Sequence, residues 1–518
     1  MPAPAPTRVR VPAQSAMTQT MPRPWLGRRG LLATGLVLAA VATPGHAGNL
    51  SYLEGLLANT PQGGWVQVNT NRFSDAWASV AQGGLPDGSY SNPASIVLAW
   101  SSVAWDSVND QLLLWGGGHA NYMGNEMYAW SGDTGLWSRG SLPSRLDRYG
   151  ATATYFTADD AAPQSAHTYD NNVFAPVNGM FVTFGGAAFN DGGAFTVRGA
   201  TGDPVIAGPW AWDPQKADPN KVGGTTGSGY LAATEGGEMW TNLRGQWTGN
   251  GPATSQIDTS SAYRTENGRD VIYVTGDAGG SGWQPLYRYE LGDVRAGEAG
   301  RFNRIGVSEN AATFQGAAAI DSVNNLYVRS SVAGGNFQGL GVWDLSTLPV
   351  DGNGDPTDCS FASATGRCLV DRYISLVDPS GSHFALTHQH GMAFDEATGK
   401  LYLWDGRDRG TVWSTEAAFN ADGSLATTWV VTRLDSSTTA QPLGDFSTPS
   451  YEIGVLGKWQ YVPELGAFIA LDRYDIASSD AGVWLYKPFA AAIPEPGAAV
   501  MMLAGLGLLG GLGRRRRA

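Results

Sequence analysis

Short apolar segments recur along the chain, joined in pairs by a tight polar turn and followed by glycines. Each pair predicts a β-hairpin, because about four to eight apolar and aromatic residues bounded by turn residues are typical of strands. A third apolar segment with tyrosine or tryptophan follows each pair, as in GVWLYKP near the C-terminus. The chain is therefore predicted to be all-β, with six small antiparallel sheets. The six pairs begin at Ser101, His167, Ser261, Gln315, Gln389 and Gly457.

A sheet of three or four strands buries both of its faces only by stacking on neighbours. The clearest copy, residues 104–139, has glycines after its second strand and aromatic residues in its third. Such repeats resemble kelch repeats, which build the β-propellers of the galactose oxidase-like central domain superfamily. The resemblance implies that residues 48–492 form a kelch-type β-propeller of six blades. A seventh blade is the alternative, if residues 66–100 or the long interval between the second and third pairs contain one.

A closed ring requires a fourth strand for the last sheet, which shows only three strands before Pro488. The segment GGWVQVNT, around Trp65, is a spare apolar strand near the N-terminus. We therefore expect this N-terminal strand to complete the last blade and close the ring.

The N-terminal residues 1–47 have the pattern of a secretory signal peptide, with basic residues before an apolar run. That run extends over residues 31–42, and the small residues Gly45 and Ala47 predict signal peptidase cleavage after Ala47. The adjacent Arg28 and Arg29 fit either the general secretory route or the twin-arginine route.

The C-terminal residues 493–518 combine Pro494-Glu495-Pro496, an uncharged run over 497–513 and the arginines 514–517. This order resembles the PEP-CTERM sorting signal of Gram-negative bacteria, which an exosortase processes. A bare transmembrane anchor is the alternative, because the run is just long enough to cross a bilayer. The resemblance implies export across the inner membrane to the cell surface or the matrix, with the C-terminal helix anchoring the protein before processing.

The charge of the chain excludes some partners. The formal net charge is −13, and nine of the 33 basic residues lie in the two terminal segments, so the body is more acidic still. Nucleic acid and anionic lipid are therefore not expected to bind the body. Carriers of PEP-CTERM signals are usually exported by bacteria that make extracellular polysaccharide, so the resemblance implies carbohydrate as a partner.

Cys359 and Cys368 are the only cysteines, and in an oxidising compartment they are predicted to close a small disulfide ring. Two unpaired thiols are the alternative. The resemblance to galactose oxidase raises copper chemistry, which requires a tyrosine crosslinked to a cysteine. Both cysteines lie in one loop outside the predicted strands, so we expect neither copper nor any other required cofactor.

Histidines mark the predicted channel mouth, where propeller ligands usually bind. His119 follows three glycines, His167 begins the second hairpin, and His388 and His390 precede the fifth. In the segment GGGHANYMGNEMY, Asn121 and Tyr122 could bind sugar hydroxyls or stack on a sugar face. The nearby Asn125 and Glu126 could instead brace the turn. We therefore predict carbohydrate binding by Asn121, Tyr122, His388 and His390.

A polysaccharide lyase for uronate polymers is a second hypothesis, because β-elimination needs a base, an acid and a cation near the carboxylate. His119 or His167 would be the base, Tyr169 or Tyr263 the acid, and Arg264 the cation. A structural matrix protein without a ligand is the third hypothesis.

The segment VDGNGDPTD places side-chain oxygens at Asp351, Asn353, Asp355 and Asp358, which resembles the start of a calcium loop. Pro356 replaces the usual glycine at the sixth position, and the distal glutamate is missing. The segment predicts either a weak Ca²⁺ site or a polar turn.

Overall fold

The computed structural model describes most of the body of the chain. The terminal residues 1–48 and 491–518 lie outside the described part, and so do the predicted signal peptide and sorting segment. No helix within the described ranges is long and apolar enough to cross a bilayer. The structure describes residues 49–79, 92–119, 121–148, 155–157, 161–189, 193–199, 201–225, 234–252, 258–275, 284–309, 315–330, 339–360, 366–382, 384–387, 389–444, 446 and 453–490.

All six predicted hairpins form, and each supplies the first two strands of an antiparallel sheet. The hairpins pair β2 (Ser102–Asp106) with β3 (Gln111–Trp115), β9 (Asn172–Ala175) with β10 (Met180–Thr183), β17 (Ser261–Glu266) with β18 (Arg269–Thr275), β21 (Ala318–Asp321) with β22 (Leu326–Arg329), β26 (Gly391–Asp395) with β27 (Lys400–Trp404), and β30 (Trp459–Val462) with β31 (Ala467–Asp475).

Third and fourth strands complete the sheets. The third strands are β4 (Tyr128–Ser131), β14 (Trp210–Trp212), β19 (Gln284–Glu290), β23 (Gly339–Asp344), β28 (Val412–Thr415) and β32 (Asp480–Lys487). The fourth strands are β5 (Trp137–Arg139), β15 (Trp240–Asn242), β20 (Gly300–Ser308), β25 (Arg372–Val377), β29 (Thr428–Leu434) and β1 (Gly64–Gln67). The fourth and fifth sheets are continuous, because β25 and β29 pair in parallel.

Shorter elements lie between these strands. The additional strands are β6 (Leu146–Arg148), β7 (Tyr155–Thr157), β8 (Ala166–His167), β11 (Ala187–Ala188), β12 (Thr196–Arg198), β13 (Pro204–Ile206), β16 (Trp247–Gly249) and β24 (Leu369–Val370). The helices are α1 (Ser51–Asn59), α2 (Ala94–Val97) and the 3₁₀ turns η1 (Phe73–Ala76), η3 (Pro214–Lys216), η5 (Leu345–Thr347) and η6 (Leu456–Lys458). The described parts of the two stretches considered for a seventh blade hold only such short elements and no further four-stranded sheet.

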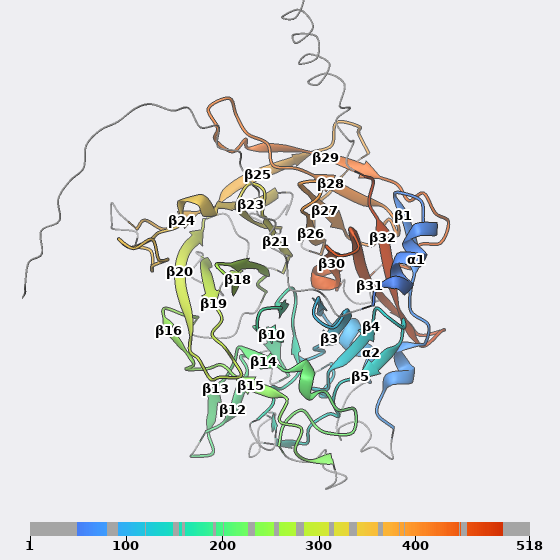
Figure 1. Ribbon diagram of the computed structural model, residues 1–518, viewed down its shortest axis with the longest axis vertical. Helices are drawn as coiled ribbons and strands as arrows, with labels where there is room; N and C mark the ends of the chain where they lie inside the picture. The colour runs from blue at the N-terminus through green and yellow to red at the C-terminus, as the bar shows by residue number, and fades with distance from the viewer. Residues whose placement is uncertain are drawn as a thin grey trace, which may run out of the picture. The chain divides into compact units, whose positions relative to one another are not determined.

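The six sheets surround a common centre in a propeller-like, all-β arrangement (Figure 1). The first strand of each sheet contacts the first strand of the next, and β30 of the last sheet contacts β2 of the first. A buried hydrophobic cluster fills each of the six junctions between neighbouring sheets. Side chains of one strand alternate between the two junctions, since Val103 and Trp105 pack toward the last sheet and Ala104 toward the second.

The N-terminal strand β1 pairs with β32, the third strand of the last sheet. Trp65 on β1 is 1% exposed, and its indole Nε1 donates a hydrogen bond of 2.8 Å to the carbonyl oxygen of Gly410 in the fifth unit. The ring of Trp65 packs against those of Trp404, Trp459 and Tyr486 at centroid distances of 5.1 to 5.6 Å. The two ends of the described body therefore meet in one sheet.

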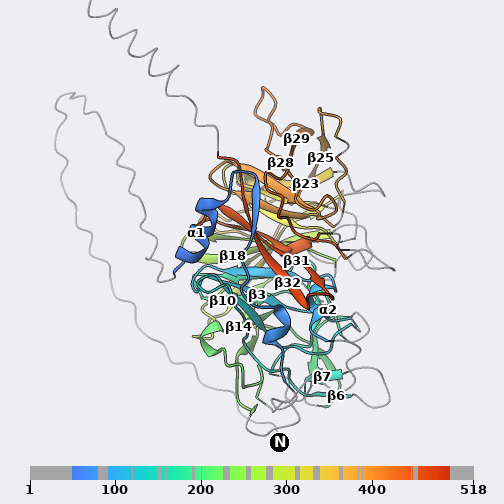
Figure 2. The same cartoon turned by 90° about the vertical axis from the view of Figure 1, so that its right-hand side faces the viewer.

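Helix α1 was not predicted, although Leu50, Leu53 and Leu57 form an apolar stripe at helical spacing. These leucines are buried in the cluster that also holds side chains of β31 and β32, beside which α1 lies in Figure 2. The ammonium of Lys487, at the end of β32, donates hydrogen bonds to the carbonyl oxygens of Leu57 and Thr60. The C-terminal end of α1 is thereby fixed to the last strand.

The turn that joins the first two strands is held by an aspartate. In three units Asp106, Asp321 and Asp395 accept hydrogen bonds from the backbone amides two and three residues further on. The second unit has Ala175 at this position, and there Asp270 of the third unit accepts from the turn amides across the junction. The turn of the second sheet is thus bound to the third sheet. We call this end of the first strands the turn face.

The opposite end of the first strands, which we call the head face, carries a strained backbone. Five residues that precede a first strand have positive φ angles of 26° to 54° although none is glycine. An L-residue in this region is destabilised by roughly 1–2 kcal/mol, so the surrounding contacts impose the conformation. These residues are Trp100, Tyr169, Asp258, Gln315 and Leu456.

Candidate functional site

A cavity of about 680 Å³ lies at the centre of the six sheets, between their first strands. The first strand of each sheet contributes one large side chain to this cavity, directly before the last residue of the strand in five units and two residues earlier in the longer β17 of the third. Five of the six side chains are aromatic, and we call the set the aromatic ring. Its members are Trp105, Phe174, Tyr263, Ile320, Phe394 and Tyr461.

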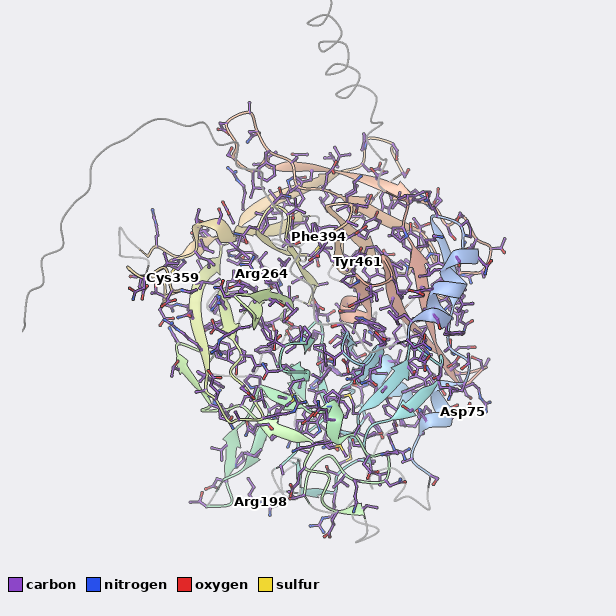
Figure 3. The ribbon with its side chains drawn as sticks, viewed as in Figure 1. Asp75, Arg198, Arg264, Cys359, Phe394 and Tyr461 are labelled. Atoms are coloured by element: carbon purple, nitrogen blue, oxygen red, sulfur yellow. A yellow bond between two sulfur atoms is a disulfide. The ribbon has the colours of Figure 1, made fainter. Side chains whose placement is uncertain are left out.

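The aromatic ring contacts the cavity and the junctions between sheets at once. Phe394 is 8% exposed, whereas Tyr461 is half-buried. Figure 3 shows Phe394 and Tyr461 near the middle of the molecule, together with Arg264, while Cys359 lies at the outer edge. The ring therefore presents aromatic surface to a central space bounded by all six sheets.

Asp170 forms the inner end of the cavity. Its Oδ2 accepts a hydrogen bond of 2.7 Å from the amide of Ala318 in the fourth unit, and its carbonyl oxygen accepts from Ser261 in the third. A Cβ atom added to Gly457 of the sixth unit would lie 2.5 Å from its Oδ1. Asp170 belongs to the second unit, and its side chain contacts the fourth and sixth units. It therefore lies across the centre and forms the floor of the cavity.

Burial shapes the chemistry of this carboxyl group. Asp170 is 5% exposed, and burial raises its pKa well above the ordinary value despite the hydrogen bond from Ala318 and the charge of Arg329. Among the described residues, Oδ1 of Asp170 has no hydrogen-bond partner. The floor therefore offers an unused acceptor to a bound molecule.

The charged residues around the cavity are mainly acidic. Its lining contains one cation, Arg264, and the four acids Asp170, Glu266, Glu396 and Glu464. Arg264 donates to Glu266 at 2.6 Å and also to Asn325 and the hydroxyl of Tyr273, so its guanidinium is already engaged. The cavity is therefore electronegative and disfavours anionic ligands.

Glu266 belongs to an ion-pair network on the third sheet. Its second carboxylate oxygen accepts from the guanidinium of Arg288 at 2.7 and 3.0 Å. Burial alone would raise the pKa of Glu266, but Arg288, Tyr273 and Arg264 lower it below the ordinary value. Glu266 is therefore ionised, and the neighbouring arginines balance its negative charge. The exposed Glu396 and Glu464 lie at the turn face, where the cavity opens, and we call this opening the mouth. No basic residue of the lining balances their charge.

Two further polar atoms at the cavity lack partners within the described part of the chain. Nε1 of Trp105 is a buried donor, and Oδ1 of Asn172 is a buried acceptor. Buried polar groups without partners are uncommon in folded proteins. Both atoms are covered by protein, although their residues line the cavity.

The head face brings several predicted residues together. The exposed His119 and the buried His167 lie with ring centroids 5.3 Å apart, and Tyr169 lies 6.2 Å from His167. Nε2 of His167 is 2.9 Å from the side-chain amide of Asn121, which donates to it once the amide is oriented to fit its neighbours. Burial, followed by the charges of His119 and Lys458, lowers the pKa of His167 to about 3. His167 is therefore neutral and accepts through Nε2.

Tyr122 does not fit the predicted stacking role, because it is fully buried. Its hydroxyl donates to Oε1 of Glu126 at 2.5 Å, and the hydroxyl of Tyr128 donates to the same oxygen at 2.8 Å. Asn125 is also buried, and its side chain links the backbone of Pro163 to that of Ser144. This segment thus has the bracing role that was the alternative for Asn125 and Glu126.

His390 is held within the fifth unit. It is 1% exposed, its Nδ1 lies 3.1 Å from the backbone amide of Thr387, and its Nε2 lies 3.5 Å from Asp405. These contacts give His390 a structural environment at the head of its own sheet. His388 lies outside the described residues.

The residues predicted for a lyase do not form one site. His119, His167 and Tyr169 lie at the head face, whereas Arg264 lies near the turn of the third sheet and Tyr263 extends toward that turn. The hydroxyl of Tyr263 donates to Asp270 at 2.8 Å, and Arg264 pairs with Glu266. The sequence predicted that these residues meet at the heads of the blades, at the channel mouth, but Tyr263 and Arg264 lie within β17, away from its head.

The acidic loop has the geometry of a polar turn. Oδ1 of Asp351 accepts from the amides of Asn353 and Asp355, and Asp358 accepts from the amide of Arg304. No group of three or more histidine, cysteine, aspartate or glutamate side chains suited to a metal ion occurs in the described ranges. The calcium site stays a prediction.

Cys359 and Cys368 are joined by a disulfide, and both side chains are buried. The amide of Cys359 donates to the carbonyl oxygen of Arg304, so the loop is attached to the third sheet. The disulfide is distant from the cavity and supports the outer edge of the molecule (Figure 3).

Sequence reasoning missed Asp170 and the aromatic ring. A signal for the ring was present, since a large apolar residue lies at the same distance from the turn in five of the six repeats, and Tyr263 lies two residues further from its turn. No comparable signal marks Asp170, because its partners Ala318 and Gly457 are far away in the sequence.

Comparison with known proteins identifies one segment of the chain. Residues 492–517 match the PEP-CTERM protein-sorting motif, which implies export and sorting to the surface or membrane in Gram-negative bacteria, with processing by an exosortase. No curated protein matches the chain.

Several solved structures show a weak likeness. They include a mutant α-L-arabinofuranosidase from Fusarium graminearum with an iminosugar inhibitor (TM-score 0.34, 10% identity, 72% of this chain and 88% of that chain). An auxiliary nutrient binding protein from Bacteroides thetaiotaomicron has a TM-score of 0.35 at 10% identity, covering 81% of this chain and 75% of its own. The Dos1 propeller has a TM-score of 0.30 at 9% identity, covering 83% and 88%.

Proposed function

We propose that the chain is an exported, exosortase-sorted β-propeller of six kelch-type blades, closed by its N-terminal strand, that binds carbohydrate at the cell surface or in the matrix. The binding site is the central cavity. The observation that carries this proposal is the aromatic ring around a space of about 680 Å³. Small-molecule sites commonly have volumes of about 300–1,000 Å³ and combine apolar walls with a few polar groups.

The cavity suits a sugar for two reasons. Aromatic side chains such as Phe394 and Tyr461 provide flat apolar surface that can pack against the C–H face of a sugar ring. The floor offers Oδ1 of Asp170, which can accept a hydrogen bond from a sugar hydroxyl while Oδ2 accepts from Ala318. The sorting motif supports an extracellular ligand because it implies export.

The lyase hypothesis is weaker. A uronate would enter a cavity whose lining has four acids and one cation, and that cation, Arg264, is paired with Glu266. Elimination requires a cation free to neutralise the substrate carboxylate. The split between the head face and Arg264 leaves no single place where a base and this cation meet a substrate.

The test is binding of the purified full-length protein to a panel of neutral, amino and uronate oligosaccharides. Tyr461→Ala is expected to weaken binding roughly tenfold or more, because truncating a central aromatic contact typically costs over 1 kcal/mol. Phe419→Ala is the matched control, since Phe419 is exposed and lies outside the cavity. Circular dichroism checks that both variants fold.

Three outcomes oppose the proposal. An ultraviolet-absorbing unsaturated product from a uronate polymer supports the lyase instead. Binding that Tyr461→Ala and Phe419→Ala affect equally places the site outside the cavity. Absence of binding to every oligosaccharide of the panel supports the hypothesis of a structural matrix protein.

A further inference from the structure

The central cavity combines three features that single out one ligand group. Its floor is the buried carboxyl of Asp170, its wall is the aromatic ring, and its mouth carries Glu396 and Glu464. The floor and the mouth are formed by different units and are independent observations. Resting on the proposed function, we propose that the cavity binds the protonated amine of a terminal amino-sugar residue, with the ammonium at Asp170.

Asp170 is the contact for the ammonium. Asp170 is only 5% exposed, and its Oδ1 has no hydrogen-bond partner among the described residues. An ammonium supplies three donors and no acceptor, and its positive charge favours the ionised form of a carboxyl whose pKa burial raises, so it complements the unused oxygen of Asp170. Hydrogen bonds between charged groups are roughly twice as strong as those between neutral groups.

Arg329, the buried cation whose charge acts on Asp170, is hydrogen-bonded elsewhere. Arg329 donates to Gln284 and to the carbonyl oxygens of Asp258 and Gln315. Its charge is offset by the carboxylates of Asp258 and Asp371 as well as by Asp170. The positive charge of Arg329 is therefore already balanced, and it does not prevent a ligand ammonium from binding at Asp170.

The walls and the mouth favour the same charge. An ammonium near the face of an aromatic ring is attracted by about 0.5–2 kcal/mol, more as water is excluded, and the cavity presents five aromatic rings. Glu396 and Glu464 at the mouth have no basic partner in the lining, so they attract a cation and repel a uronate. The neutral N-acetyl form of the same sugar gains none of these charge interactions.

The shape of the cavity indicates the end of a chain. Asp170 closes the floor by bridging three units across the centre. A polymer therefore cannot thread through the cavity and inserts only its last residue. Recognition of this kind gives a fixed number of bound proteins per polymer, whatever the polymer length.

The experiment is calorimetric titration of the full-length protein at pH 7 with three oligomers of equal length, built from glucosamine, N-acetylglucosamine and glucose. We expect the glucosamine oligomer to bind at least tenfold more tightly than the other two. Asp170→Asn keeps the acceptor for Ala318 but cannot ionise, and it is expected to abolish this preference, so that the glucosamine oligomer binds no more tightly than the glucose oligomer. A longer glucosamine polymer is expected to bind the same number of proteins per chain.

Controls separate this inference from the proposed function. The double variant Glu396→Gln/Glu464→Gln changes only exposed residues and is expected to reduce the preference about threefold, whereas Glu416→Gln, exposed and outside the lining, leaves it unchanged. Equal binding of the three oligomers, or a preference that survives in Asp170→Asn, overturns the amine site but retains carbohydrate binding. Failure of all three oligomers to bind rejects both.

Discussion

Replacement of Trp65 by alanine tests whether the N-terminal strand closes the ring. The side chain is 1% exposed, and three aromatic rings of the fifth and sixth units surround it. Truncation of a buried tryptophan typically costs 3–5 kcal/mol, and the orphaned carbonyl of Gly410 adds about 1 kcal/mol. The expected loss is therefore about 5 kcal/mol, a large part of the ~5–15 kcal/mol of a typical domain.

Urea denaturation followed by far-ultraviolet circular dichroism measures this loss. Trp65→Phe is the matched variant, because it keeps most of the buried apolar area but loses the indole donor, and it is expected to cost about 1 kcal/mol. If Trp65→Ala unfolds at the same urea concentration and with the same slope as the unchanged protein, β1 does not close the ring. The proposed six-bladed architecture then fails.

Three further changes have effects of defined sign. Lys458 is fully buried, and burial lowers its pKa to about 7. Between pH 7 and about 10.4 the unfolded chain therefore binds a proton that the folded chain lacks. The unfolding free energy of the unchanged protein should rise with pH over this window. Lys458→Met should remove that rise and increase the unfolding free energy at pH 7 by up to about 4 kcal/mol in pH-dependent urea denaturation, and an unaltered pH profile contradicts the assignment. Gln315→Gly should stabilise by about 1 kcal/mol in the same assay, because it relieves a φ of 26° and removes a buried acceptor without a partner; a loss of stability refutes this reasoning. The double variant Cys359→Ser/Cys368→Ser should lower stability by about 2–3 kcal/mol without changing oligosaccharide affinity, and an altered affinity contradicts the peripheral placement of the disulfide.

The hairpins were predictable because their signals are local. Apolar alternation defines the strands, and Asp106, Asp321 and Asp395 hold turns whose amides lie two and three residues away. The proximity of His119 and His167 was also predictable, since both mark the head face. In each case the interacting groups are close in the sequence or repeat at a fixed position.

The site was not predictable because its groups come together only in the folded chain. Asp170 meets Ala318 and Gly457 through packing of distant units, and no motif marks it. Tyr122 was misassigned for a related reason, since a polar glycine-rich loop suggests exposure, whereas the carboxylate of Glu126 draws the phenol inward. Polar segments are exposed on average, but a buried acceptor reverses that tendency.

The place where the last strand ends bears on how a tethered molecule is oriented. Lys487 and Pro488 share a small pocket with Gly466 and Thr398, which belong to turns of the sixth and fifth units, so the chain leaves the body on the turn face. Only four residues separate Lys487 from the start of the sorting motif at 492, a reach of at most about 18 Å. A molecule that holds the motif therefore lies within about 18 Å of Lys487, on the same face of the body as the acidic residues Glu396 and Glu464 at the opening of the cavity.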